Sequence, residues 1–168
     1  MRHRRKLSAG VIAALALLAI AYLKRQVAPP ERVTAPGRLA ATRLCVHVVD
    51  GDTLEVEGGE RVRLIGVDTP ETVDPRRPVQ HFGKEASAFT RRMVQGKTVR
   101  LEYDQETRDQ YDRTLAYVYL QDGTFLNAEI IRQGYGHAYT RFPFRYQEQF
   151  LALEREACEQ GRGLWAAR

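Results

Sequence analysis

The chain is poor in the residues that build thiolate metal centres and disulfide scaffolds. It has two cysteines among 168 residues, Cys45 and Cys158, and their spacing matches no zinc-binding pattern. His47, His81 and His137 likewise show no spacing typical of a metal site or a catalytic triad. The sequence therefore shows no signature of a zinc centre built on thiolates or histidines. The two cysteines are compatible either with one disulfide, which an exported protein permits, or with two buried thiols.

An excess of charge of one sign is also missing from most of the chain. The formal net charge of +5 comes from residues 1–25, which hold six Lys and Arg residues and no acid. Taking these six from the 26 basic residues leaves 20 against 21 acidic residues, a net charge of −1. The overall charge therefore gives no argument for a nucleic-acid partner, and any attraction to phosphate must come from the local placement of cations.

Only one long apolar run is present, near the N-terminus. Residues 11–23 are 13 consecutive apolar residues, short of the roughly 20 residues of a spanning helix. Basic residues flank the run on both sides, so residues 1–25 are predicted to be a signal-anchor helix or a signal peptide cleaved near residues 19–21. A buried or interfacial helix is the third alternative. The positive N-terminus predicts an exported domain, anchored to the membrane and facing the periplasm or exterior, or secreted if the signal is cleaved.

The rest of the chain reads as a linker and one domain. Residues 26–42 contain three prolines and little periodicity, which is typical of a linker, and residues 43–168 form the predicted domain. Alternating β-branched residues and periodic apolar residues predict strands at 43–49, 53–56, 61–67, 98–103 and 114–120, and helices at 82–94, 126–132 and from about 146. This order predicts an α+β fold, a five-stranded OB-type barrel with about three packed helices, preceded by the N-terminal hydrophobic helix.

Three short motifs carry the charged residues of interest: VVDGDTLEV (48–56), VRLIGVDTPE (62–71) and DQYDRTLAYVY (109–119). Asp52 follows a tight turn, so its carboxylate can point off the end of a hairpin, and Asp68 ends the predicted third strand. Pro70 holds Thr69 extended, which leaves the Thr69 carbonyl able to turn toward an ion. Two carboxylates, a carbonyl and water make a hard oxygen site that suits calcium better than zinc. Seen alone, the DGD segment would be a simple turn.

Three further side chains supply the chemistry of phosphodiester hydrolysis. Glu71 follows the stiff turn at Pro70 and can orient an attacking water or accept its proton. Arg63 and Arg113 are permanently charged, planar cations that can stabilise charge on phosphate oxygens in the transition state. The alternatives are a solvated loop glutamate and two surface salt bridges. The hydrolytic interpretation requires Asp52 and Asp68 to lie close enough to share an ion, with both arginines turned toward it.

Taken in order, with FGKEASAF (82–89) between the second and third, these motifs resemble the staphylococcal nuclease family, also called the micrococcal nuclease or thermonuclease family. The resemblance runs from about residue 45 to residue 165. It implies the OB-type barrel, calcium as the cofactor, and cleavage of DNA and RNA, single strands preferred, to 3′-phosphate products. It also implies roles for individual residues: Arg63, Glu71 and Arg113 in catalysis, Asp52, Asp68 and Thr69 in metal binding, and Asp50 as an indirect partner of the ion.

The resemblance extends less clearly to substrate binding. Tyr111 and Tyr139 match positions where the family places tyrosines beside a terminal phosphate or a base, although tyrosines are as often core residues. Arg77, with Arg76 beside it, lies in a Pro-flanked loop that can rim the site. We expect stacking on aromatic rings to be tolerant of sequence.

The chain departs from the family pattern at three places. Asp112 stands where the family usually has glycine, and its charge can pair with Arg113 and weaken that cation. Gln110 replaces a lysine, which removes a phosphate contact. After Tyr139 a second tyrosine is missing, and Arg141 or Phe142 can stack in its place.

Two other classes of protein compete with the nuclease hypothesis. One is a non-catalytic OB-fold module that binds nucleic acid or a protein at the cell envelope, and the other is a structural envelope protein. The presence of all five charged residues of the predicted site, Asp52, Arg63, Asp68, Glu71 and Arg113, favours the nuclease. The expected partners are DNA and RNA as substrates and the membrane through residues 1–25, and the expected oligomeric state is a monomer.

Overall fold

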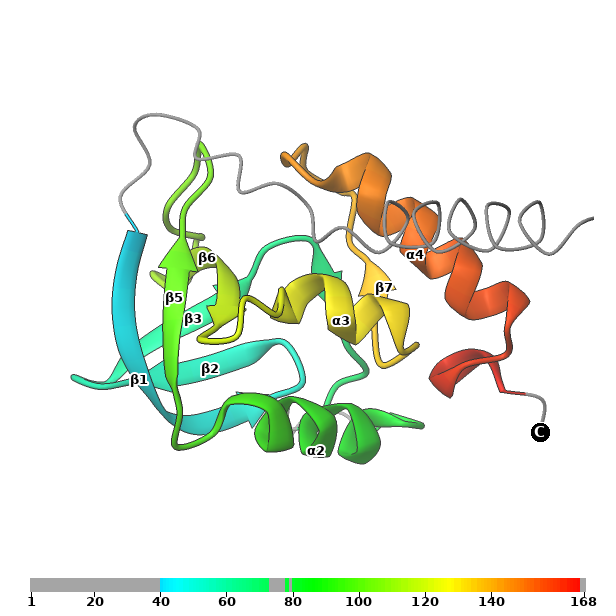
Figure 1. Ribbon diagram of the computed structural model, residues 1–168, viewed down its shortest axis with the longest axis horizontal. Helices are drawn as coiled ribbons and strands as arrows, with labels where there is room; N and C mark the ends of the chain where they lie inside the picture. The colour runs from blue at the N-terminus through cyan, green and yellow to red at the C-terminus, as the bar shows by residue number, and fades with distance from the viewer. Residues whose placement is uncertain (1–39, 73–77, 79, 167–168) are drawn as a thin grey trace, which may run out of the picture. The chain divides into compact units, whose positions relative to one another are not determined.

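A closed barrel of five strands forms the centre of the domain (Figure 1). The computed structural model describes residues 40–72, 78 and 80–166. In this part of the chain the barrel strands, in the order in which they pair, are β1 (Ala40–Asp50), β2 (Thr53–Val56), β3 (Glu60–Leu64), β6 (Thr114–Leu120) and β5 (Thr98–Glu102). Neighbours are antiparallel except β3 and β6, which are parallel. The predicted five-stranded barrel is confirmed.

Strand β1 closes the barrel because it pairs with two neighbours. Residues 40–44 pair with β5, and residues 45–50 pair with β2 across two irregularities in register. The strand begins at Ala40, three residues before the predicted start, and thus takes in residues 40–42 of the predicted linker. Pairing of these residues with β5, a contact far away in sequence, explains why local periodicity does not reveal them.

The third predicted strand is interrupted at Gly66, which has a φ of 72°. A side chain at this position would collide with the ring of Phe144, because a Cβ there would lie 2.5 Å from it. The chain turns there and continues as β4 (Val67–Asp68), which pairs with β7 (His137–Ala138) as a separate two-stranded sheet. This turn carries Asp68 off the end of the barrel and beside the segment that follows α3.

Within the described residues three α-helices accompany the barrel, as predicted: α2 (Gly83–Val94), α3 (Leu126–Arg132) and α4 (Gln147–Glu159). Helix α2 packs against β1 and α3, and α3 packs against β6 and α4 (Figure 1). A short 3₁₀ turn, η1 (Gly163–Trp165), follows α4.

The core is apolar and continuous between barrel and helices. Val48, Leu54 and Leu101 from the barrel and Ile130 and Phe150 from the helices are all completely buried. The residues that form the apolar patterns in the sequence are the ones buried in this core. This is why those patterns predict the strands and helices correctly.

Both cysteines are free thiols: one is buried in β1 and the other is exposed on α4. The sequence left two alternatives, one disulfide or two buried thiols. The structure has no disulfide between Cys45 and Cys158, and only Cys45 is buried.

Some predictions concern residues outside the described part of the chain. These are the N-terminal helix at 1–25, the linker up to residue 39, and Arg76 and Arg77. Among the residues that are described, no helix is long and apolar enough to cross a membrane.

Candidate active site

Arg63 lies between two carboxylates at the end of the barrel. Its Nη2 is 3.3 Å from Oδ2 of Asp52 and 3.6 Å from Oδ1 of Asp68. Its Nη1 donates to the carbonyls of Leu64 and Val67, at 2.9 and 2.6 Å. Strand β3 supplies the arginine, the turn after β1 supplies Asp52, and β4 supplies Asp68. Three separate elements therefore bring their charged side chains to one point.

Asp52 is buried and holds the neighbouring segment in place. Its Oδ2 accepts hydrogen bonds from the backbone N and Oγ1 of Thr69, at 3.0 and 3.1 Å, and its Oδ1 accepts one from Thr53. Gly51 makes the close approach possible, since a Cβ there would lie 2.6 Å from Oγ1 of Thr69. The two loops that carry the predicted metal ligands are thus locked together.

The carboxylates around Arg63 carry more negative charge than one guanidinium can neutralise. Burial raises the pKa of Asp68, and the charge of Asp52 raises it further, against the opposing effect of Arg63 and His137. Among the described residues, no group of three Asp, Glu, His or Cys side chains converges as a metal site. Asp52 and Asp68 would each offer a hard oxygen donor, and a bound calcium ion, which takes about six to eight oxygen ligands, would need carbonyl and water oxygens as well.

Asp50 and Glu71 lie together next to this cluster. Asp50 accepts hydrogen bonds from Oγ1 and N of Thr72, at 2.7 and 3.3 Å, and from N of Gly51 at 2.8 Å. Burial raises the pKa of Asp50 to about 6, and the Glu71 and Asp52 carboxylates add to the effect while the hydrogen bond from Thr72 opposes it. The hydrogen bonds of Asp50 thus tie the turn after β1 to the segment that carries Glu71.

The backbone of Glu71 is fixed by Gln80. The Glu71 N donates to Oε1 of Gln80 and the Gln80 N donates to the Glu71 carbonyl, both at 2.9 Å. The Glu71 carboxylate accepts a hydrogen bond of 3.0 Å from N of Thr72. The two hydrogen bonds between Glu71 and Gln80 hold these two residues together.

Arg113 is held by a residue that the sequence does not single out. The Asp109 Oδ2 lies 2.7 Å from both Nε and Nη2 of Arg113, and Oδ1 accepts a 3.0 Å hydrogen bond from the Arg113 backbone N. Burial would raise the pKa of Asp109, but hydrogen bonds from Arg113 and from the Tyr111 backbone outweigh it and lower the pKa. The spacing of four residues is the available signal, but outside a helix that spacing does not imply contact.

Asp112 pairs with Arg108, whereas the sequence suggests Arg113 as its partner. Its Oδ1 and carbonyl accept hydrogen bonds from Nη1 of Arg108, at 2.9 and 3.0 Å. Asp112 has a φ of 61°, a conformation that aspartate tolerates better than most residues. The Asp112 side chain is 85% exposed and pairs with Arg108. The structure therefore shows no pairing of Asp112 with Arg113.

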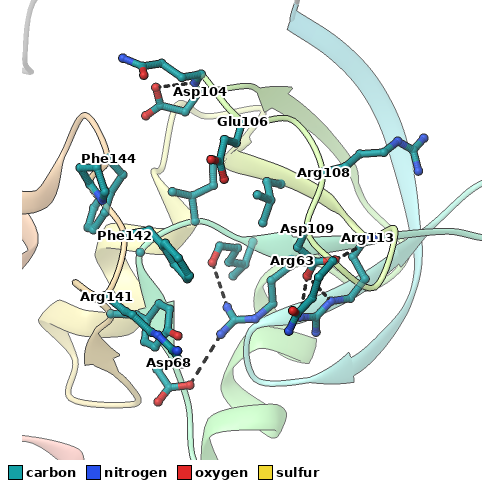
Figure 2. Close-up of a pocket in the computed structure, with 18 of the residues that line it drawn as sticks. Arg63, Asp68, Asp104, Glu106, Arg108, Asp109, Arg113, Arg141, Phe142 and Phe144 are labelled. Atoms are coloured by element: carbon teal, nitrogen blue, oxygen red, sulfur yellow. Dashed lines mark hydrogen bonds and ion pairs between the residues drawn. The ribbon is translucent and has the colours of Figure 1, made fainter.

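A cavity of about 570 Å³ lies beside Arg63 and extends between the loop before β6 and the loop after β7. The predicted site residues that line it are Arg63, Asp68, Tyr111, Arg113 and Tyr139. Figure 2 shows Arg63 between Asp68 and Arg113, with Phe142 on the same side as Asp68 and away from Arg113. Glu71 is not among the described residues that line the cavity.

Aromatic rings and a further cation stand along the walls of this cavity. Tyr111 is 71% exposed, with the Arg113 guanidinium carbon 5.3 Å from its ring centre. Phe142 is 58% exposed and lies 6.3 Å from the Tyr139 ring and 5.7 Å from the guanidinium carbon of Arg141. The two residues that the sequence offers in place of a second tyrosine therefore both reach the cavity.

Comparison with known proteins assigns the chain to a family. The family model described as Staphylococcal nuclease homologue matches residues 61–167. Thermonuclease of Staphylococcus hyicus is 38% identical over 160 residues, 93% of this chain and 94% of that protein. Thermonuclease of Staphylococcus intermedius is 38% identical over 166 residues, 96% of this chain and 98% of that protein. The SPbeta prophage-derived endonuclease YokF of Bacillus subtilis is 36% identical over 126 residues, 71% of this chain and 42% of that protein. With its motifs, its barrel and these relatives, the chain belongs to the staphylococcal nuclease family.

Proposed function

We propose that the chain is a calcium-dependent nuclease that hydrolyses DNA and RNA, preferably single-stranded, to 3′-phosphate products. As a member of its family it is a nuclease, a phosphodiester hydrolase. The cofactor, the substrate preference and the products are the proposal. The observation that carries it is the sharing of Arg63 by Asp52 and Asp68, beside a cavity that Arg113 also lines.

Arg63 and Arg113 are proposed to bind the oxygens of the scissile phosphate. Each guanidinium is already oriented by protein acceptors, Arg63 by two carbonyls and Arg113 by Asp109. Preorganised donors stabilise developing charge without the cost of reorientation during the reaction. The two cations would therefore act mainly in the transition state.

Asp52, Asp68 and the carbonyl of Thr69 are proposed to hold calcium. When bound, the ion supplies positive charge against the phosphate oxygens and makes a bound water more acidic. The support for this assignment is geometric: the carboxylates of Asp52 and Asp68 both lie within ion-pair distance of the single guanidinium of Arg63.

Glu71 is proposed to orient the attacking water and to accept its proton. The water oxygen forms a new bond to phosphorus while the bond from phosphorus to the 5′-oxygen breaks, and the 5′-oxygen leaves with the bonding electron pair and takes a proton from solvent to become a 5′-hydroxyl. The proton passes to a Glu71 carboxylate oxygen, and the phosphate stays on the 3′-oxygen. The hydrogen bond from Thr72 and the two shared with Gln80 support a fixed position for this carboxylate.

The preference for single strands rests on the aromatic walls of the cavity. Bases that are not paired can stack on Tyr111, Tyr139 or Phe142, and such stacking contributes about 1–3 kcal/mol per base. A paired duplex keeps the faces of its bases covered by neighbouring base pairs. The exposed rings therefore favour a strand that is locally unpaired.

Cleavage of labelled oligonucleotides by the full chain tests the proposal. Single-stranded DNA and RNA should be cut in calcium and left intact in a chelator, and end-group analysis should find 3′-phosphates. Binding in calcium without cleavage would favour the non-catalytic OB-fold module. Cleavage that is unaffected by the chelator would contradict the calcium assignment.

The location of the enzyme is a separate proposal. We propose that residues 1–25 direct export, so that the domain faces the periplasm or the exterior as a membrane-anchored or secreted monomer. The support is the apolar run with its flanking cations. Cell fractionation and the mass of the mature N-terminus test it, since recovery from the cytosol with an intact N-terminus would contradict export.

A further inference from the structure

Asp109 fixes both ends of Arg113. At the side chain, Asp109 Oδ2 is 2.7 Å from Nε and 2.7 Å from Nη2. At the backbone, Oδ1 accepts hydrogen bonds from N of Arg113 and N of Tyr111, at 3.0 and 2.9 Å. The Asp109 side chain is 17% exposed and the Arg113 side chain 28%. One carboxylate thus determines where the loop before β6 places this guanidinium.

The geometry leaves one edge of the guanidinium for a ligand. Arginine has five N–H donors in a rigid plane, and Asp109 occupies the edge formed by Nε and one side of Nη2. The N–H groups of Nη1 and the other side of Nη2 point away from the carboxylate. Because Arg113 lines the cavity (Figure 2), this second edge is the one that can meet a phosphate.

The same carboxylate also repels the substrate. It places a negative charge one guanidinium away from a phosphate, in a partly buried site where screening by solvent is reduced. Orientation of Arg113 helps the transition state, whereas repulsion weakens binding of the polyanion. The two effects should therefore appear in different kinetic constants.

We propose that Asp109 is the positioning residue of Arg113. By orienting the guanidinium Asp109 raises turnover, and by its negative charge it weakens substrate binding. The proposal rests on the phosphate-binding role given to Arg113 above. It concerns a residue that touches the arginine and not the reacting atoms.

The neighbouring pair of Asp112 and Arg108 provides a matched control. Asp112 lies three residues from Asp109 and pairs with Arg108 at 2.9 Å, but both side chains are largely exposed, 85% and 54%. Asp112→Asn removes the same negative charge near the same cavity without touching Arg113. Asparagine also tolerates the positive φ of this position.

Asp109→Asn removes the orientation of the Arg113 side chain while keeping the structure of the loop before β6. The amide oxygen of asparagine can still accept the two backbone hydrogen bonds, so the loop is kept. Its NH₂ group then faces the Nε–H of Arg113, donor against donor, so the side chain is released. Asp109→Glu keeps the charge but moves it by one methylene, which displaces Arg113 while preserving the repulsion.

The test is the steady-state cleavage of a single-stranded oligonucleotide by the full chain in calcium. Asp109→Asn should lower kcat by about tenfold or more, as expected for lost orientation, and should lower KM. Asp112→Asn should leave kcat unchanged, since the charge it removes is exposed and already paired with Arg108, and Asp109→Glu should lower kcat with KM unchanged. Combined with Arg113→Lys, Asp109→Asn should have little further effect on kcat, because lysine has no planar guanidinium for Asp109 to orient.

The outcomes separate this proposal from the function on which it rests. An unsubstituted chain that does not cleave in calcium overturns both. The positioning role alone is overturned if the unsubstituted chain cleaves normally and Asp109→Asn has the same kcat as Asp112→Asn. The melting curve of Asp109→Asn must then show that this variant is folded. If Asp109→Asn fails to fold, a normal kcat for Asp109→Glu is the result that overturns it.

Discussion

At the scale of single residues, the site is a set of arginines that are already paired with protein acceptors. Arg63 holds two carbonyls and two carboxylates, and Arg113 holds one carboxylate from a nearby turn. The sequence motifs predict which residue types come together. They do not predict the partners of Asp109 and Asp112, because pairing within an irregular loop depends on backbone angles such as the φ of 61° at Asp112.

Arg63→Met should lower turnover by at least tenfold, because removal of a preorganised donor commonly costs about 3–4 kcal/mol in the transition state. Rates on a fluorogenic oligonucleotide in calcium measure this. Arg61→Met is the matched control, since Arg61 lies on the same strand with its side chain exposed. A normal rate for the folded Arg63 variant would contradict the role.

Glu71→Gln should also lower turnover by about tenfold or more, because the amide cannot accept a proton from water. The backbone hydrogen bonds to Gln80 do not involve the substituted atoms, so the melting temperature should change little. Glu57→Gln removes an exposed carboxylate from the turn after β2 and should leave the rate unchanged. Equal rates for the two variants would count against Glu71 as the base.

The pair of Asp109 and Arg113 should make part of the stability depend on pH. A carboxylate whose pKa is lowered in the folded state stabilises the fold above its ordinary pKa, about 3.9, and this contribution is lost as the pH falls through the folded-state value. The difference in melting temperature between the unsubstituted chain and Asp109→Asn should therefore be present at neutral pH and shrink in strong acid. A difference that stays constant over this range would contradict the lowered pKa.

At the scale of elements, the sequence predicts what depends on local periodicity and misses what depends on distant contacts. The helices and barrel strands follow apolar patterns, and their predicted positions are correct within a few residues. The sheet of β4 and β7 is missed, because two-residue strands show no periodicity and Gly66 breaks the pattern between β3 and β4. That missed sheet is what carries Asp68 to Arg63, so the site geometry could not be read from the sequence alone.

Asn127 joins α3 to the barrel and should be important for stability. It is completely buried, its Oδ1 accepts a 2.9 Å hydrogen bond from N of Val118, and its Nδ2 donates to the carbonyls of Ile65 and Ala116. Asn127→Ala would leave the Val118 N and the Ile65 carbonyl without this partner, at a cost of about 1–3 kcal/mol each.

Thermal unfolding followed by circular dichroism measures the effect. The melting temperature should fall by about 10 °C, given that each kcal/mol corresponds to several degrees in a domain of this size. Gln149→Ala on the exposed side of α4 is the control and should change it by no more than a degree or two. Equal melting temperatures would show that α3 is held by its apolar contacts alone.

At the scale of the whole molecule, ligand binding and folding are linked through the loops at the end of the barrel. Calcium and a nucleoside 3′,5′-bisphosphate should together raise the melting temperature by more than either does alone, because ligands that prefer the native state stabilise it. Thermal shift assays with each ligand and with both measure this. Asp68→Asn should lose the calcium effect, and the absence of a joint shift in the unsubstituted chain would favour a structural protein.

The closure of the barrel has a consequence for how the protein meets other molecules. Open sheet edges expose rows of N–H and C=O groups that recruit strands from other chains, and here β1 covers both β2 and β5. The backbone groups that form these pairings are therefore already bonded within the barrel. Self-association by strand exchange would first require one of the paired seams of the barrel to open, and the parallel seam between β3 and β6, with three residue pairs against five between β1 and β5, is the shorter one.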